Sequence, residues 1–310
     1  MSVTHTTAIL ADKTVDVLTD EASGTRLMVA RQGAEPVSLA RRGADGEWKG
    51  FLWRDGDLTK NPDGWNNHAT VMGYYIHRLK DEQTIYRGQS IRGGTHGLLR
   101  HKTFAEPEFN KHSLIYTMPA GGYSPEEYPF RVAMKLTYTL EASGRLLVRF
   151  DFTNQEVDKP VHLSFGLHPG FAVGSLEAAE VLLPAGTYRR HLAPGNFLSG
   201  ETANIQHPGG PMPFAKSELP DSFLLEPLGG DEQRTFTLVD PAGERRVVLD
   251  CPEAPYLTLW SDGHNFVCME PCWGLPDAAN QVPFEQKAGI QEIEPGGMLE
   301  RSFTIQPLLT

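Results

Sequence analysis

Residues 134–152 read Met-Lys-Leu-Thr-Tyr-Thr-Leu-Glu-Ala-Ser-Gly-Arg-Leu-Leu-Val-Arg-Phe-Asp-Phe. Up to Leu140 a large apolar side chain stands at every second position, and the same alternation returns from Leu146 onward. Because neighbouring side chains of a strand point to opposite faces, this period of two predicts two half-buried strands. The sequence Ala142-Ser143-Gly144 between them has the small and polar residues of a tight turn. The stretch therefore predicts an antiparallel hairpin with one wetter face.

The same pattern of strand, turn and strand recurs along the chain. A second hairpin is expected from Phe236–Val239 and Val247–Leu249 around Asp240-Pro241-Ala242-Gly243, whose proline and glycine fit a type I turn. A third is expected from Tyr256–Trp260 and the strand after Asp262-Gly263. Because three such hairpins are expected, antiparallel pairing should dominate the fold.

Further strands are expected from shorter runs. Val161, Leu163 and Phe165 begin an alternating strand that we expect to end near Pro169, and residues 27–30 and 36–39 are weaker candidates. No segment shows a convincing twelve-residue helical period. The sequence therefore predicts an all-β chain, a large antiparallel β-sandwich with long loops. No linker-like composition or short repeat interrupts it, so one domain over residues 1–310 is expected.

Bulk composition narrows the function classes. The chain has 310 residues, 40% of them hydrophobic, and a formal charge of −11 with a pI near 5.5. This acidity argues against nucleic acid or an anionic membrane as a partner. The three cysteines form no disulfide framework and no paired zinc-ligand spacing, so we expect a reducing compartment and no metal. No signal peptide, apolar span or nucleotide-binding fingerprint is visible, which favours a cytoplasmic protein without a cofactor.

Glu270 is the first candidate for chemistry. It closes the apolar run that begins at Phe266, and Pro271 is expected to stop that strand at the next residue. A carboxyl group at the end of a buried strand is costly to desolvate unless it is paired or used. Anchoring a loop through backbone N–H groups is an equally good reading of Glu270 taken alone.

Two histidines accompany it. His96 lies between glycines in Gly93-Gly-Thr-His-Gly97, where the backbone can approach a ligand and adopt positive φ, or simply form an exposed turn. His168 precedes Pro169, which restricts its geometry and directs it from an expected strand end. An imidazole there can act as acid or base near neutral pH. A hydrogen-bonded strand-end histidine explains the same pair equally well.

Weaker candidates are polar or aromatic. Arg78 could offer a planar fork to sugar hydroxyls, although a surface arginine is the default reading. Asp221 could accept from two hydroxyls, or it could start a turn. Tryptophans at 65, 260 and 273 could stack on a sugar ring, but core packing accounts for most tryptophans. The histidines at 68, 77, 96 and 101 show no metal-ligand spacing.

Taken in order, the segments that carry these residues resemble the aldose 1-epimerase (galactose mutarotase) family. The resemblance covers the chain from about residue 20 to its C-terminus, and it depends on the ordered set of motifs rather than on any one of them. The segments are Asn61-Pro-Asp-Gly-Trp-Asn-Asn-His-Ala69, Tyr75-Ile-His-Arg-Leu-Lys80, Gly94-Thr-His-Gly-Leu-Leu-Arg100, Leu163-Ser-Phe-Gly-Leu-His-Pro-Gly-Phe171, Cys268-Met-Glu-Pro-Cys-Trp-Gly274 and Lys287-Ala-Gly-Ile-Gln-Glu-Ile-Glu-Pro-Gly296.

The resemblance implies a fold and a set of roles. The family's fold is a large twisted β-sandwich. Glu270 matches the base on the anomeric hydroxyl, His168 the acid on the ring oxygen, and His96 the histidine that binds and polarises the sugar. Arg78 and Asp221 fall where the family holds ring hydroxyls, and we add Trp273 as a substrate-binding candidate.

The expected function is therefore interconversion of the α and β anomers of a hexose or related sugar, in a monomer or homodimer. Leu98, Leu99 and the stretch from Thr70 to Tyr75 depart from the family pattern and are expected to reshape the pocket. Phosphorylated hexoses are substrates of one related branch. The alternatives are therefore a mutarotase of such a sugar, a non-catalytic carbohydrate-binding protein, and glycoside hydrolysis by Asp221 and Glu270, which needs suitably spaced carboxylates.

Overall fold

The hairpin predicted over residues 134–152 forms as expected. In the computed structural model, which describes residues 3–212, 216–230, 234–241 and 245–309, β11 (Val132–Leu140) and β12 (Leu146–Asn154) pair antiparallel, with Leu140 opposite Leu146. On each strand the residues at every second position are buried, which follows from the alternating pattern. The prediction from periodicity is confirmed here.

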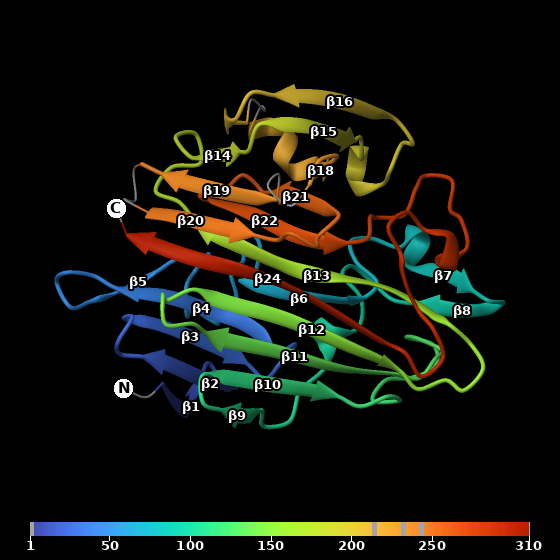
Figure 1. The fold of residues 1–310 in the computed structure, drawn as a ribbon, viewed down its shortest axis with the longest axis horizontal. Helices are drawn as coiled ribbons and strands as arrows, with labels where there is room; N and C mark the ends of the chain where they lie inside the picture. Colours follow the sequence, from blue (N-terminus) through green and yellow to red (C-terminus); the bar gives the residue numbers. More distant parts are fainter. Residues whose placement is uncertain (1–2, 213–215, 231–233, 242–244, 310) are drawn as a thin grey trace.

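This hairpin lies inside a nine-stranded sheet (Figure 1). The hairpin expected around Pro241 belongs to the same sheet, while residues 242–244 of its turn lie outside the described part of the chain. In spatial order the strands are β17 (Gly210–Pro211), β14 (Glu180–Leu183), β19 (Thr235–Asp240), β20 (Arg245–Asp250), β24 (Met298–Leu309), β12, β11, β10 (Ser113–Met118) and β9 (Glu108–Asn110).

A second, eight-stranded sheet holds the segments singled out for chemistry. The hairpin around Gly263 lies at its centre and is confirmed. Its strands are β16 (Thr202–His207), β15 (Gly186–His191), β18 (Phe223–Pro227), β21 (Tyr256–Trp260), β22 (Phe266–Trp273), β13 (Val161–Ala172) and β23 (Gln291–Ile293), with β6 (Ala69–Tyr74) also paired to β13.

The N-terminal part forms a five-stranded sheet that contains both weaker strand candidates, now β3 and β4. The strands run in sequence order, β1 (Thr4–Leu10), β2 (Lys13–Asp20), β3 (Thr25–Ala30), β4 (Glu35–Arg42) and β5 (Trp48–Gly50). The remaining elements are the hairpin of β7 (Gln83–Tyr86) and β8 (Gln89–Arg92) and the short 3₁₀ helices η1 (Lys80–Glu82), η2 (Leu99–His101), η3 (Pro194–Asn196), η4 (Lys216–Asp221) and η6 (Phe284–Gln286).

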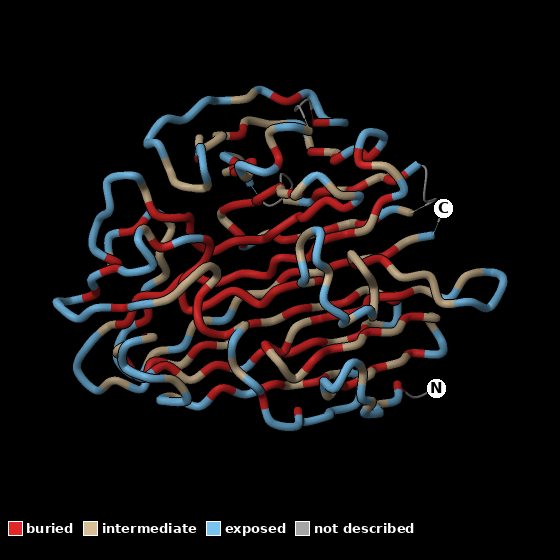
Figure 2. Tube along the Cα trace, turned by 180° about the vertical axis from the view of Figure 1, so that it is seen from behind, coloured by how far each residue is buried: buried red, intermediate tan, exposed pale blue. Residues whose placement is uncertain are grey.

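The two larger sheets pack through aromatic side chains. Phe152 of β12 meets Phe165 of β13 with ring centroids 4.6 Å apart, and Phe165 stacks on Trp273 of β22 at 5.0 Å. One buried apolar cluster runs from Val3 to Ile305 and draws on all three large sheets. Figure 2 shows buried residues along the central strands and exposed ones along the surrounding loops. The all-β, antiparallel sandwich is thus confirmed.

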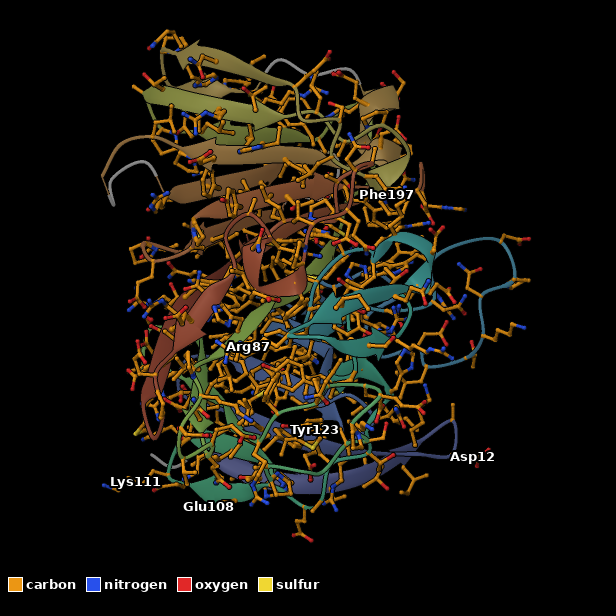
Figure 3. The ribbon with its side chains drawn as sticks, turned by 90° about the vertical axis from the view of Figure 1, so that its right-hand side faces the viewer. Asp12, Arg87, Glu108, Lys111, Tyr123 and Phe197 are labelled. Carbon is orange, nitrogen blue, oxygen red and sulfur yellow. The ribbon has the colours of Figure 1, made fainter. Side chains whose placement is uncertain are left out.

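Seen from the side, the N-terminal strands and the β15–β16 region lie at opposite ends of the molecule. Figure 3 places Asp12, Glu108 and Lys111 at one end and Phe197, which follows η3, toward the other. No helix among the described residues is long and apolar enough to span a lipid bilayer.

Two strand boundaries were predicted wrongly, both at a proline. β13 continues through Pro169 to Ala172, and β22 continues through Pro271 to Trp273. The ladder between these strands pairs Gly166 with Cys272 and next Gly170 with Cys268, and it skips the residues between. Both prolines lie in this unpaired stretch, where a missing N–H breaks no ladder bond. The prolines therefore interrupt the pairing and leave the strands continuous.

Candidate functional site

The interrupted ladder creates the centre of the site. In the register that pairs Gly166 with Cys272 and Gly170 with Cys268, His168 lies directly opposite Glu270. Cross-strand partners share one face of a sheet, so both side chains project to the same side. Nε2 of His168 lies 3.3 Å from Oε1 of Glu270. Residues separated by about a hundred positions thus become a facing pair in mid-strand, not the strand-end groups that the sequence predicted.

The backbone comes unusually close at this place. A Cβ built on Gly166 would lie 2.5 Å from the carbonyl oxygen of Pro271, nearer than real Cβ contacts come. Only glycine therefore allows β13 and β22 to approach as they do beside the unpaired stretch. Gly166 and the two prolines together fix the separation of the His168 and Glu270 side chains.

Glu270 is buried without compensation. Its side chain is 1% exposed, and within the described part of the chain neither carboxylate oxygen has a hydrogen-bond partner. The contact with His168 lacks hydrogen-bond geometry. Burial raises the pKa of the Glu270 carboxyl well above its ordinary value. Buried polar groups are nearly always satisfied, so this carboxyl group is prepared for a partner that enters from outside.

His168 is held between aromatic rings. Its ring centroid lies 4.9 Å from that of Trp65 and 5.5 Å from that of Trp260, and it is 5% exposed. Burial lowers the pKa of His168 to about 3. Burial thus disfavours the charged form of both His168 and Glu270. Burial therefore opposes a charged ion pair between the two side chains.

His96 reaches the same place from a loop. Its ring centroid lies 4.9 Å from that of His168, and its backbone N–H donates to the carbonyl of His77 at 2.7 Å. The expected positive φ is found, at 66° for His96 and 76° for Gly97. A Cβ on Gly97 would lie 2.3 Å from the carbonyl oxygen of Gly73, so this glycine serves close packing on β6. Burial, first among several causes, lowers the pKa of His96 well below its ordinary value.

His77 is a third imidazole, which the sequence did not predict as part of the sugar site. It lines the cavity, is 6% exposed, and places Nε2 3.5 Å from Oγ1 of Thr258 and 3.7 Å from Sγ of Cys272. Burial lowers the pKa of His77 to about 3. The one available signal was its position beside Arg78. It was weighed only as a metal ligand, and for that its spacing is wrong.

Arg78 lies at the exposed side of the cavity and is held through its backbone. Its carbonyl accepts the N–H of Asp277 at 3.1 Å, and a carboxylate oxygen of Asp277 accepts the N–H of Lys80 at 2.9 Å. The other oxygen of Asp277 forms a buried ion pair with Lys287. This ion pair ties the segment after β22 to the segment that carries Arg78.

These side chains surround one cavity of about 220 Å³. That volume lies below the roughly 300 Å³ at which drug-sized ligand pockets begin, and it suits a single sugar ring. Its mixed aromatic and polar lining is typical of sites for neutral, hydroxyl-rich ligands. The lining residues are Trp65, Asn67, His77, Arg78, Thr95, His96, Arg100, His168, Asn196, Ser222, Trp260 and Glu270.

Two expected substrate-binding residues lie elsewhere. Trp273 is 1% exposed and stacks on Phe165 in the core, because it lies at odd spacing from Glu270 and therefore on the other face of β22. Asp221 is exposed, accepts the N–H of Gly195 at 3.2 Å, and borders a neighbouring hollow rather than the cavity. Its neighbour Ser222 reaches the cavity instead. Trp65 and Trp260 supply the aromatic wall for which Trp273 was considered.

Two groups of side chains bring metal-ligand atoms together around Glu270. One group consists of His77, Cys272 and Glu270, and the other of His168, Cys268 and Glu270. In each group the possible ligand atoms lie within 4.8 Å of one another. The thiolate is the metal-binding form of cysteine, and burial raises the pKa of both thiols well above the ordinary value. Neither group therefore presents a ready set of anionic ligands.

Comparison with known proteins places the chain in a family. The pattern of the family described as Aldose 1-epimerase matches residues 16–303. No curated protein sequence matches the chain.

Solved structures share its fold. A galactose mutarotase related enzyme from Lactobacillus acidophilus has a TM-score of 0.82 at 22% identity, over 99% of this chain and 98% of that one. A galactose mutarotase-like protein from Lactobacillus casei has a TM-score of 0.81 at 23% identity, over 95% and 100%. A galactose 1-epimerase from Lactobacillus acidophilus has a TM-score of 0.69 at 14% identity, over 99% of each chain.

Proposed function

The chain belongs to the aldose 1-epimerase family, and from that premise we propose that it interconverts the α and β anomers of a monosaccharide by general acid–base catalysis. The observation that carries the proposal is the bare carboxyl group of Glu270, which faces His168 at 3.3 Å in a cavity of about 220 Å³. A buried group with a perturbed pKa in a cavity is what acid–base catalysis requires.

Anomer exchange opens a cyclic hemiacetal and closes it on the other face. Glu270 takes the proton of the C1 hydroxyl while the bond between C1 and the ring oxygen breaks, and His168 gives a proton to that oxygen. Rotation about C1–C2 and the reverse transfers yield the other anomer. His96, whose Nδ1 has no hydrogen-bond partner among the described residues, is placed to bind a ring hydroxyl.

The reaction needs a charged carboxylate on Glu270 and a proton on His168, and burial disfavours both of these forms. A sugar that enters the cavity can donate hydroxyl hydrogen bonds to the carboxylate, which stabilises its charged form. The 3.3 Å separation of Nε2 and Oε1 then allows the proton to pass to the imidazole. Ligand binding in this way prepares the base and the acid together.

The scale of catalysis is consistent with these groups. A positioned acid or base contributes roughly 10²–10⁴-fold, so the pair supplies about 10⁴–10⁸-fold. Because mutarotation already proceeds unaided in water, no covalent intermediate is needed.

The competing readings fit the cavity less well. Hydrolysis of a glycosidic bond needs two carboxyl groups, but Glu270 is the one carboxylate among the described residues that line the cavity. A binding protein without activity gains nothing from an unsatisfied buried carboxyl group, which opposes folding by roughly 1–3 kcal/mol. The bare Glu270 thus favours an enzyme.

The test is Glu270→Gln, which keeps the shape and removes the base. We expect anomer interconversion, followed by polarimetry or NMR, to fall by roughly 10²–10⁴-fold while sugar still quenches Trp65 and Trp260 fluorescence. Asp221→Asn, outside the cavity, is the matched control and should keep its rate. Unchanged interconversion in Glu270→Gln would remove this residue as the base. Saturable binding without acceleration by the unmodified protein would establish the binding-protein alternative.

A further inference from the structure

Asp277 is a buried carboxylate that lies outside the cavity. Its residue is 2% exposed and does not line the cavity. One carboxylate oxygen forms the ion pair with Lys287, which is itself 5% exposed. The other oxygen accepts the backbone N–H of Lys80 at 2.9 Å and a side-chain N–H of Gln281 at 2.7 Å. In contrast to Glu270, this buried carboxylate bonds to partners through both oxygens.

The backbone of Asp277 joins two parts of the cavity wall. Its N–H donates to the carbonyl of Arg78 at 3.1 Å, and its carbonyl accepts the N–H of Leu198 at 2.9 Å. Ala279 extends the contact, because its N–H donates to the carbonyl of Leu198 at 3.0 Å. Arg78 lines the cavity, and so does Asn196, which lies in the same segment as Leu198. Asp277 thus connects the segment of Arg78 to the segment of Asn196.

These two parts of the wall have no place in the large sheets. Arg78 follows the end of β6, and Asn196 lies in the short helix η3. Connecting segments are more mobile than the strands they join unless other contacts hold them. The side chain of Lys80 adds one such contact, since its Nζ donates to the carbonyl of Ala279 at 2.7 Å. The contacts around Asp277 therefore hold together two loops that are distant along the chain.

A buried ion pair is a poor way to gain stability. Removing two charges from water opposes folding about as strongly as their attraction favours it, and apolar residues of similar volume often serve equally well. Burial lowers the pKa of Lys287, and the Asp277 carboxylate opposes that shift. A charged acceptor binds N–H groups more strongly than a neutral one. The pair therefore contributes a fixed geometry more than net stability.

We infer that Asp277, held by its ion pair with Lys287, is a positioning residue that sets the Arg78 and Asn196 sides of the cavity at the spacing a bound sugar needs. The inference rests on the proposed function, because the ligand between these two sides is the sugar. The role is indirect, since Asp277 itself does not line the cavity.

The acid–base pair is held in another way. Glu270 and His168 lie on β22 and β13, and the ladder between these strands and the close approach at Gly166 fix their separation. Loss of the Asp277 contacts should therefore weaken sugar binding while proton transfer is unchanged. In kinetic terms KM should rise and kcat should stay the same.

The first experiment removes the ion pair without leaving a buried charge. Asp277→Ala/Lys287→Met lacks both charges and the acceptor for the Lys80 N–H, whereas Asp277→Asn/Lys287→Met lacks the charges but keeps an acceptor oxygen. We expect KM to rise by roughly 10-fold in the alanine variant, as for the loss of one charge-assisted hydrogen bond, with kcat within about twofold of the unmodified protein. The asparagine variant should show a smaller rise.

An exposed ion pair of the same two residue types provides the matched control. Asp45 and Lys49 lie 2.7 Å apart at the start of β5, and Asp45→Ala/Lys49→Met should leave KM and kcat unchanged. The same KM in folded Asp277→Ala/Lys287→Met as in this control would overturn the inference, because a purely structural pair affects stability alone. A fall in kcat at unchanged KM would overturn it as well.

A second variant leaves the buried ion pair intact, so that folding is preserved. Lys80 begins η1 after Leu79, whose backbone is extended with ψ of 136°, and proline is tolerated at such a position. Lys80→Pro removes the N–H that donates to Asp277, while Lys80→Met keeps it and controls for the lost side chain. KM should be higher in Lys80→Pro than in Lys80→Met. Identical KM values would overturn the positioning role.

Amide hydrogen exchange separates this inference from the proposed function, because it requires no turnover. The N–H groups of Lys80 and Leu198 both bond to Asp277 and should exchange roughly 10-fold faster in Asp277→Ala/Lys287→Met. Unchanged exchange at both would overturn the positioning role even in an active enzyme.

Methyl glycosides cannot mutarotate, so their quenching of tryptophan fluorescence reports binding alone. Weaker quenching by a methyl hexoside in Asp277→Ala/Lys287→Met, together with faster exchange, would support the positioning role even if the unmodified protein did not interconvert anomers. Equal quenching in the variant and the unmodified protein would overturn it and leave the proposed function standing.

Discussion

Asp16 and Glu270 are both carboxylates sealed from solvent, at 0% and 1% exposure, and the protein treats them in opposite ways. The Asp16 carboxylate of β2 accepts hydrogen bonds from Nε and Nη2 of Arg31, each at 2.9 Å, and from the hydroxyl of Tyr116 at 3.0 Å. His5 lies 3.1 Å away as a further partner. Glu270 has no hydrogen bond among the described residues.

The pKa directions follow from this difference. Burial pushes the pKa of Asp16 upward, but the hydrogen bonds from Arg31, His5 and Tyr116 outweigh it, and the net pKa lies below the ordinary value. For Glu270 burial acts alone and the pKa rises well above the ordinary value. The chain can satisfy a buried carboxylate where that carboxylate joins two sheets. Its failure to do so at Glu270 therefore indicates a functional group rather than a structural one.

Asp16→Asn should give the largest loss of stability. Removing one partner of a buried ion pair leaves an unpaired charge, and we expect the free energy of unfolding in urea to fall by about 3–5 kcal/mol. Asp12→Asn, in the exposed turn between β1 and β2, should change it by less than about 0.5 kcal/mol. A similar small change for Asp16→Asn would show that its network contributes little.

Glu270→Met should act in the opposite direction. An apolar side chain of similar length removes an unsatisfied buried group that opposes folding by roughly 1–3 kcal/mol. We expect the free energy of unfolding to rise by that order while interconversion is lost. Thermal unfolding of Glu270→Met and Asp16→Asn, each measured beside the unmodified protein, tests this. A less stable Glu270→Met would mean that Glu270 has a stabilising partner and that the contrast with Asp16 is false.

Acid should separate the two carboxylates further. The folded-state pKa of Asp16 is depressed, so its stabilisation is present above its unfolded pKa of about 3.9 and is lost as pH falls through the folded value. The difference in unfolding free energy between the unmodified protein and Asp16→Asn should therefore shrink below about pH 4. Urea titrations at a series of pH values measure it, and a constant difference would contradict the assignment.

The pH dependence of kcat/KM is the finest test. Because the active form carries one proton on the His168–Glu270 pair, activity should persist from the depressed pKa of His168, about 3, to the raised pKa of Glu270. Unperturbed groups would confine it to between roughly 4.3 and 6.5. Polarimetry corrected for the uncatalysed rate at each pH distinguishes the two profiles. A profile of kcat/KM that falls off near the unperturbed pKa values of glutamate and histidine would show that the cavity does not perturb the pair.

Regular pairing was predictable from the sequence, and its interruption was not. A period of two identifies β11, β12 and the later hairpins because it reports which face is buried. Pro169 and Pro271 were read as strand ends, since a single strand does not reveal that its neighbour also lacks a donor. Only with the partner strand in place does the pair of prolines become an opening within a continuous sheet.

The acid–base residues of the site were predictable from the sequence, and the other residues that line the cavity were less so. Glu270, His168, His96 and Arg78 line one cavity, as the ordered motifs indicated. Trp273 and Asp221 do not line it, because one residue of register or one turn decides which face a side chain takes. Arg100 and His77 were not predicted as site residues, because they meet the other lining residues only through contacts distant along the chain, which a linear pattern does not display.

The gap in the ladder has a consequence for how this protein can change. The proposed acid and base, His168 and Glu270, stand on two central strands, whereas the lining residues Arg78, Arg100 and Ser222 come from the segments that connect strands. A change in the connecting segments can therefore alter the cavity wall without moving His168 or Glu270. Exchanging those segments between relatives would be expected to redirect the enzyme to another sugar while its proton transfer stays intact.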